Sequence, residues 1–304
     1  MDAQSITRTS GSIGRTRLVQ PRRGRRAAAP SAAAYTSRVI ALRWLASALF
    51  IAAIPVFLLL SNVRIATMEP RVYGYGFSTY GVAEVTGLDR AQLDRAAVDI
   101  VRYFADDRPL LTTRVSIGGQ EQPLFTAREA LHMRDVKGLF QAVFWLQEVA
   151  FVYLAVYVVA VYIWARERPL RRLARQCMTA GYVTAGVLAV GAVIAAIGFD
   201  SLFLAFHLVS FANDFWALDP LHDRLIQMFP RDFWFIVTLA VGVATVMEGM
   251  LLSLLGYALR SWLDRTAVVV SPPPPSAAPP DAPDASNALL ADEATAEPTA
   301  AEAP

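Results

Sequence analysis

Four long apolar stretches alternate with polar connections along the chain, and their length predicts membrane-spanning helices. A hydrocarbon core of about 30 Å is crossed by about 20 helical residues. The predicted spans cover residues 38–63, 139–165, 178–198 and 233–259. Four crossings place both ends of the chain on the same side of the membrane.

The first long connection, residues 64–138, has enough apolar positions to fold as a small unit. Side chains in "RVYGYGFSTYGV" alternate as in a strand, and "LLTTRVSI" followed by Gly118 and Gly119 predicts a strand that enters a hairpin turn. Between these segments, apolar residues recur at helical spacing: Leu93, Ala97, Ile100, Val101 and Phe104. We therefore expect a small α+β cap on the outer ends of the spans.

A further helix is predicted to begin after Thr126, because "TARE" places Glu129 three residues later in the pattern of a capping box. The helix continues through "ALHMRDVKGLF" into the second span. His132 then lies about one and a half turns above the membrane, beneath the cap.

Apolar character continues from Met178 to Phe211, which is too long for one crossing. The chain is therefore expected to break near Gly198, where Asp200 can cap a second helix that lies at the membrane surface.

The rest of this second outer connection, which covers residues 199–232, is predicted to contain a turn and a short helix. Asp219 followed by Pro220 has the pattern of a helix cap and first turn, and Pro230 ends the helix before the fourth span.

Composition supports the membrane class and charge predicts the orientation. The 304 residues are 55% hydrophobic, and a mean hydropathy of +0.39 is high for a soluble domain of this size. Nine arginines precede Trp44, where the continuous apolar run of the first span begins, and five more lie in "RERPLRRLAR" after the second span, whereas residues 199–232 contain only Arg224 and Arg231. Short cytoplasmic loops carry an excess of Lys and Arg. We therefore expect both termini and the 166–177 loop in the cytoplasm, and both long connections on the extracytoplasmic face.

The two ends of the chain have the composition of disordered cytoplasmic tails. Residues 1–37 are rich in Arg, Ala, Ser and Gly, and residues 260–304 end in a Pro-, Ala- and acid-rich stretch. The chain has a single cysteine, Cys177, so no intramolecular disulfide is available.

All three histidines fall on the predicted outer side. Asp135 follows His132 at i+3 on a helix, close enough to accept a hydrogen bond from the ring and to set its orientation. An ordinary solvated helix pair also explains this spacing. Asp214 follows His207 by seven residues, which would return it to the same helix face; the polar rim of an interfacial helix is the alternative. His222 is interpreted as a surface residue.

Two other charged residues are candidates for function. Lys137 is the one lysine among 28 basic residues and lies beside the His132 segment, where a compact ammonium could face a phosphate or a polarised carbonyl. Snorkelling at a helix end is the simpler explanation. Glu148 is an ionisable residue at membrane depth, with either a functional role or a partner such as Gln147, Gln141 or an outer arginine.

Other chemistries have less support in the residues. No His-Glu-x-x-His or comparable paired spacing predicts a metal site, no Gly-x-Ser-x-Gly elbow occurs, and no outer cysteine offers a nucleophile. General acid/base chemistry by imidazole at a lipid surface is the hypothesis that remains.

Two segments together resemble one family. "HMRDVK" at 132–137 and "FHLVSFANDFWALDPLHDRLIQMFP" at 206–230 are similar to the paired signatures of the four-span bacterial membrane family of the lipoprotein intramolecular transacylase. The resemblance covers about residues 40–260. It implies an enzyme that moves the sn-2 acyl chain of a diacylglyceryl lipoprotein to the α-amine of the lipid-bearing N-terminal cysteine, without a cofactor or a metal.

The resemblance also implies roles for residues. His132 and His207 match the two motif histidines. We expect His207 to be the base, and His132, oriented by Asp135, to polarise the carbonyl or to share the proton transfers. Asn213 or Lys137 would stabilise the oxyanion. We expect the remaining motif residues to hold the loop in shape: Asp214, Trp216 and Asp219. His222 departs from the family pattern and receives no role.

Two alternative functions remain open from the sequence. One is a non-enzymatic envelope or lipoprotein-handling protein whose acidic tail recruits a cytoplasmic partner. The other is a lipid ester hydrolase in which water replaces the amine.

Overall fold

The computed structural model describes residues 32–164 and 169–270. Two compact units divide within the first long helix, between Leu45 and Ala46. The part of the helix bundle from Ala46 onward, the cap and the site described below belong to the second unit. The predicted N-terminal arm lies outside the described residues up to position 31, and the predicted C-terminal tail lies outside them from position 271.

Four long helices form the main part of the fold: α1 (Ala32–Met68), α5 (Ala127–Trp164), α6 (Pro169–Ser210) and α8 (Arg231–Val270). Each contains a stretch with a mean hydropathy between 1.9 and 2.3 and is long enough to cross a membrane. The prediction of four spans is confirmed, but every helix is longer than its span. In particular, α6 takes in most of the predicted 166–177 loop and α8 continues to residue 270, because no Pro or Gly ends these helices where the apolar run stops.

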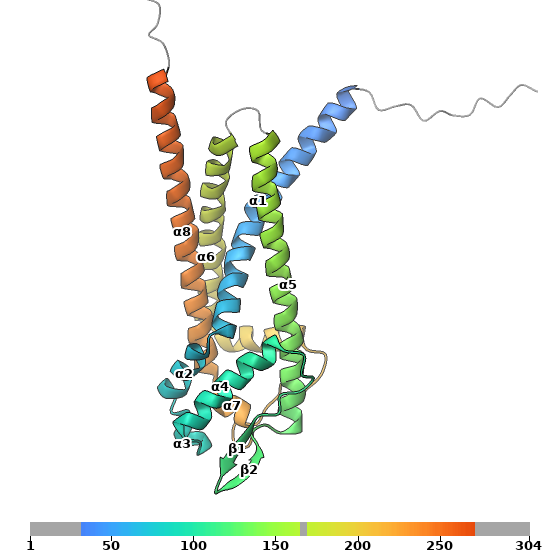
Figure 1. Ribbon diagram of the computed structural model, residues 1–304, viewed down its shortest axis with the longest axis vertical. Helices are drawn as coiled ribbons and strands as arrows, with labels where there is room; N and C mark the ends of the chain where they lie inside the picture. Colours follow the sequence, from blue (N-terminus) through green and yellow to red (C-terminus); the bar gives the residue numbers. More distant parts are fainter. Residues whose placement is uncertain (1–31, 165–168, 271–304) are drawn as a thin grey trace, which may run out of the picture. The chain divides into compact units, whose positions relative to one another are not determined.

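Helices α6 and α8 lie against each other over most of their length (Figure 1). Glycines make this approach possible. A Cβ atom on Gly181 would lie 2.2 Å from the carbonyl oxygen of Gly249, and one on Gly249 would lie 2.9 Å from Cβ of Thr184. Small residues at a helix contact let two backbones pack closely in a membrane, where the lipid itself provides no hydrophobic driving force between helices.

The two longer connections fold together at one end of the helices, as Figure 1 shows. This cap contains α2 (Pro70–Thr79), α3 (Val82–Thr86), α4 (Arg90–Ala105), β1 (Arg114–Ile117), β2 (Gln120–Pro123) and α7 (Arg224–Met228). Residues that are at most 2% exposed form its core: Phe77, Val82, Leu88, Leu93, Ala96, Ala97, Ile100, Tyr103, Leu111 and Met228. The expected α+β cap is confirmed, and residues of the second connection complete its core.

The hairpin and the helices of the cap show where sequence patterns were sufficient. Strands β1 and β2 pair in antiparallel register around Gly118 and Gly119, whose φ angles of 62° and 80° suit a tight hairpin turn. The alternating side chains of residues 71–82 predicted a strand, and this prediction is wrong, because most of the segment forms α2. Glu69 caps the helix and Pro70 stands in its first turn.

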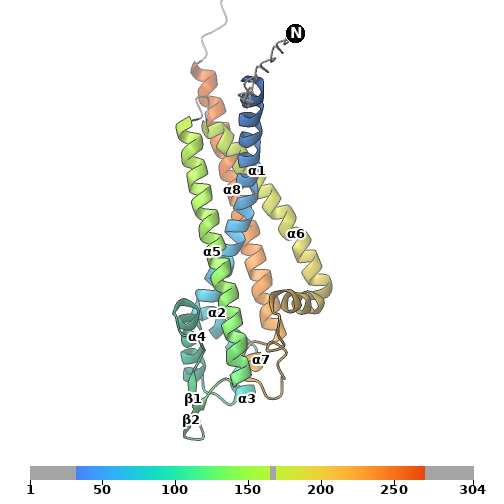
Figure 2. The same cartoon turned by 90° about the vertical axis from the view of Figure 1, so that its right-hand side faces the viewer.

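Helix α6 changes direction at Gly198, whose φ of −157° and ψ of 58° are not helical. Figure 2 shows its second part, from Phe199 to Ser210, lying across the end of the first. The predicted break is confirmed. Asp200 forms an ion pair with Arg231 at the start of α8. Val209 is 88% exposed, as expected of a helix that lies at a membrane surface.

The short helix of the second connection begins later than predicted. Residues 219–222 form a turn, in which Asp219 accepts a hydrogen bond from the backbone N–H of Leu221, and Asp223 precedes α7 as its N-cap residue. The acceptor side chain of Asp219 therefore stabilises a turn instead of opening the helix.

Candidate active site

Two histidines from distant parts of the chain meet beneath the cap. His132 lies in the second turn of α5 and His207 in the last turn of α6, and their ring centroids are 6.1 Å apart. Both are buried, with 8% and 9% of their surfaces exposed. At this separation the two rings are close enough to contact one ester and one amine.

A backbone carbonyl fixes the tautomer of His207. Its Nδ1 lies 2.8 Å from the carbonyl oxygen of Phe203, one helical turn earlier. Because a carbonyl oxygen only accepts, Nδ1 must carry the proton, and the lone pair of the neutral ring is then on Nε2. The fold thus presents a nitrogen that can accept a proton.

Aromatic rings surround the His207 imidazole. The nearest are Phe203 at 4.4 Å, Phe206 and Trp216 at 5.2 Å, and Phe211 at 5.7 Å between centroids. Trp216 was predicted only to hold the loop in shape, but its ring is in direct contact with His207. Such a shell keeps the imidazole in one orientation and keeps water away from it.

The expected pairing of His132 with Asp135 is not formed. Nδ1 of His132 is buried and has no hydrogen-bond partner among the described residues. Asp135 accepts a hydrogen bond of 2.8 Å from Nδ2 of Asn213 and lies beside Arg134. The i+3 spacing allowed the contact, but the carboxylate turns to the second connection, where it finds an amide donor.

The loop after α6 is held against α5 by hydrogen bonds. Asn213 accepts a bond from the backbone N–H of Phe215 and donates to Asp135, and Arg128 donates to the backbone oxygen of Asp214 at 2.7 Å. The expected helical relation of Asp214 to His207 is absent, because α6 ends at Ser210. Asp214 is exposed and contributes its backbone to this contact.

A fully buried carboxylate joins the same two segments. Glu129 accepts 2.6 Å hydrogen bonds from the backbone N–H groups of Thr126 and of Leu225 in α7. The bond to Thr126, together with that from the N–H of Glu129 to the Thr126 hydroxyl, confirms the predicted capping box. No local pattern pointed to the bond with Leu225, because the two residues are distant in sequence.

A cleft of about 420 Å³ opens beside the histidine pair, between α5 and the residues that follow α6. It is lined by Arg134, Asp135, Gly138, Leu139, Ser210, Phe211, Ala212 and Asn213. Phe211 also packs edge-on against His132, with the ring centroids 5.1 Å apart, so it forms a wall shared by the cleft and the histidines.

Residues 48–234 match the model of a protein family described as lipoprotein intramolecular transacylase Lit. The chain belongs to the Lit family. It is therefore a multi-pass membrane protein of an enzyme family, and the matched region includes both histidines and the whole cap.

Solved structures with the same fold come from the membrane-integral lipoprotein intramolecular transacylase Lit of Bacillus cereus. One is 17% identical with a TM-score of 0.57, and covers 75% of this chain and 98% of its own. Two histidine variants of that protein, to arginine and to alanine, are each 16% identical, with TM-scores of 0.59 and 0.58. They cover 78% and 77% of this chain and 98% and 99% of their own. A search of curated proteins finds no match.

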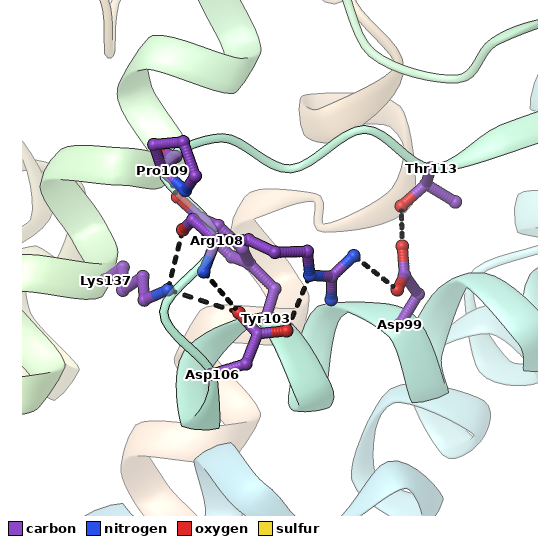
Figure 3. Close-up of polar contacts among 7 residues, drawn as sticks. All are labelled: Asp99, Tyr103, Asp106, Arg108, Pro109, Thr113 and Lys137. Carbon is purple, nitrogen blue, oxygen red and sulfur yellow. Dashed lines mark hydrogen bonds and ion pairs between the residues drawn. The ribbon is translucent and has the colours of Figure 1, made fainter.

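In this Lit-family chain, Lys137 has partners in the cap (Figure 3). Its ammonium donates to the backbone oxygen of Arg108 at 2.9 Å, lies 3.4 Å from Asp106 and stands 4.3 Å above the ring of Tyr103. Burial would raise the pKa of the Asp106 carboxyl, but hydrogen bonds from Arg108 and Lys137 outweigh it and lower that pKa. Lys137 thus fastens the segment after α4 to α5, which is a different task from stabilising an oxyanion.

The two remaining candidates in this Lit-family fold have partners other than the histidine pair. Glu148 forms an ion pair of 2.8 Å with Arg64 of α1, which is the simpler of the two predicted alternatives. Asp219 is exposed and accepts a 2.5 Å hydrogen bond from His222, whose pKa is raised by that bond. Among the described residues, no group of three or more His, Cys, Asp or Glu side chains is arranged to hold a metal ion.

Proposed function

We propose that this chain transfers the sn-2 acyl group of a diacylglyceryl lipoprotein to the α-amine of the same molecule's N-terminal cysteine. The amine nitrogen attacks the ester carbonyl carbon, and the bond between that carbon and the glyceryl oxygen breaks. The amine loses a proton and the glyceryl oxygen gains one, so the products are an amide and a free sn-2 hydroxyl. Membership of the Lit family and the buried histidine pair support this reaction.

His207 is the base in this proposal. An α-amine has a pKa of about 7.7–8.0 and is mostly protonated at neutral pH, so it needs a base to become a nucleophile. Nε2 of His207 carries the lone pair, because Nδ1 donates to Phe203. The same nitrogen can return the proton to the leaving glyceryl oxygen. This fixed tautomer is the observation that carries the assignment.

His132 and Asn213 are the candidates to stabilise the developing oxyanion. Nδ1 of His132 is buried without a partner among the described residues, and a buried polar atom of this kind is costly unless a ligand completes it. With its proton on Nδ1, the ring can donate to the ester carbonyl oxygen. The Asn213 amide is oriented by Phe215 and Asp135, so a second hydrogen on its Nδ2 has a fixed direction.

The reaction needs no cofactor. Ester-to-amide transfer is downhill, so no ATP or acyl carrier is required. Donor and acceptor belong to one substrate, and correct placement of the two groups can supply as much as about 7–11 kcal/mol of the barrier.

We further propose that the site lies on the extracytoplasmic face of a bacterial cytoplasmic membrane, with both termini in the cytoplasm. The arginine-rich segment between the second and third spans supports this orientation, because it joins the helix ends that are opposite the cap. Diacylglyceryl-modified lipoproteins and membrane lipid are the partners in this proposal.

A cell that lacks other N-acylating activity provides the test. We expect His207→Ala to leave the lipoprotein α-amine free, with an activity loss of about 100-fold or more, as measured by mass spectrometry of the N-terminal lipopeptide. His222→Ala is the matched control, because His222 is exposed and apart from the pair. Unchanged N-acylation in the His207 variant would remove the base from the mechanism, and released fatty acid without amide would indicate a hydrolase.

A further inference from the structure

The cleft beside the histidine pair has no part in the proton transfers described above. It runs between α5 and residues 210–213 and has a volume of about 420 Å³, within the range of about 300–1,000 Å³ that is usual for small-molecule sites. Its position relative to His132 can be followed along the helix.

One face of α5 connects the cleft to the histidines. Asp135 and Leu139 are three and seven residues after His132, so all three lie on nearly the same helix face. A rise of 1.5 Å per residue places Leu139 about 10 Å further along α5, in the direction of the apolar span. The cleft therefore leads from the reacting groups toward the bilayer.

The chemistry of the lining changes along this direction. Arg134, Asp135 and Asn213 give the outer part charged and hydrogen-bonding groups, whereas Leu139 and the ring of Phe211 give an apolar lining. A lipid ester has the same order, with a polar glyceryl and amine end and an alkyl chain. The α-ammonium of the substrate also has the charge that complements the Asp135 carboxylate.

We propose that this cleft holds the beginning of the sn-2 acyl chain, and that Gly138 determines which chains are accepted. The assignment rests on the proposed transacylase function. The ester carbonyl lies at the histidine pair, and the alkyl chain then passes Gly138 and Leu139 on its way to the membrane. Phe211 packs on one side against the histidines and on the other against the chain.

Gly138 offers a clean way to fill the cleft. A Cβ atom added at this position meets no atom within 4 Å, and the residue lies in a helix interior. Replacing it should not lower stability, because glycine is less favourable than leucine inside a helix by several tenths of a kcal/mol or more. A leucine at this position would reach into the space assigned to the chain.

The experiment compares two synthetic lipopeptides with a free α-amine, one with a palmitoyl and one with a butyryl group at sn-2. Full-length wild-type protein and Gly138→Leu are assayed in lipid nanodiscs, and the N-acylated product is measured by mass spectrometry. We expect the variant to lose about tenfold or more in kcat/KM for the palmitoyl substrate and to keep the wild-type value for butyryl. A butyryl chain is too short to reach Gly138 from the histidine pair.

Gly186→Leu is the matched control, because a Cβ atom at Gly186 also meets no atom within 4 Å but belongs to α6. It should leave both substrates unaffected. Wild-type rates of Gly138→Leu with both substrates would overturn the assignment, and so would an equal loss with both, which would indicate that the cleft holds the peptide. Wild-type protein that transfers neither chain would overturn the proposed function itself, and with it this inference.

Discussion

A single backbone carbonyl determines which nitrogen of His207 is available to accept a proton. The bond from Nδ1 to the Phe203 oxygen lies within one helix turn, so it depends only on α6 remaining helical to its last turn. His132 has no comparable anchor, and its orientation depends on the rings packed against it, above all Phe211. At the scale of single residues, the two imidazoles are therefore held in different ways and suit different tasks.

The role of the Asn213–Asp135 hydrogen bond can be tested by exchanging the two side chains. Asn213→Asp places two carboxylates where a 2.8 Å hydrogen bond was, and we expect a loss of acyl transfer of about tenfold or more from repulsion that displaces the loop. The double variant Asn213→Asp with Asp135→Asn restores an amide donor opposite a carboxylate. It should be clearly more active than Asn213→Asp alone, because the repulsion is removed, and any loss that remains relative to wild type measures the Asn213 amide as an oxyanion donor; the lipopeptide assay gives both values in a double-mutant cycle.

The reversal separates two roles for Asp135. If this carboxylate acted by orienting His132, Asp135→Asn would reduce activity and the double variant would be no better than either single one. Recovery in the double variant requires that Asp135 acts mainly through Asn213.

At the scale of elements, the first three turns of α5 organise the site. Glu129 binds α7, His132 faces His207, and Asp135 binds the loop after α6. Three successive contacts on one helix thus fix the second connection relative to the first. The cap as a whole can then align the two histidines without a direct bond between them.

Glu129→Gln tests the contact between α5 and α7. A carboxylate has two acceptor oxygens for the N–H groups of Thr126 and Leu225, whereas glutamine has one, so one buried N–H loses its partner. We expect a loss of about 1–3 kcal/mol in unfolding free energy, and faster hydrogen exchange in residues 211–228. Thr126→Ala is the comparison, because it removes only the capping bond within α5. Equal exchange in the two variants would contradict a role for Glu129 between the elements.

Local signals predicted several elements, and long-range contacts explain the failures. Gly198, the paired Gly118 and Gly119, and the capping box at Thr126 act through their own backbone, so sequence was sufficient for the break, the hairpin and the helix start. The helix at 70–79 depends partly on burial of Tyr73 and Phe77 in the cap core, which an alternating pattern does not reveal.

At the scale of the whole molecule, the fold brings together two segments that are far apart in sequence. The sequence motifs named both histidines, because the resemblance to a known family identified them. The sequence did not predict the hydrogen-bond partners of Asp135 and Lys137, because these donors and acceptors come close only when the cap folds. The cleft likewise has no local signature, because its two sides come from α5 and from the end of α6.

The proposed orientation explains why polar chemistry adjoins apolar sequence. The cap covers one end of the helices (Figure 1). His132, near the start of α5, meets His207, near the end of α6. The proposed orientation puts this end of the helices where a lipid ester meets the polar surface. The second part of α6, with its exposed apolar side chains, can rest in the same layer.

A crossover experiment with purified protein tests the central claim most directly. Two diacylglyceryl lipopeptides are mixed, one unlabelled and one with heavy isotopes in both the peptide and the sn-2 acyl chain. The masses of the products are measured by mass spectrometry. Transfer within one molecule by the histidine pair predicts only fully light and fully heavy N-acyl lipopeptides, and none with either His132→Ala or His207→Ala. Products that combine a light peptide with a heavy chain, or free fatty acid in place of amide, would contradict it.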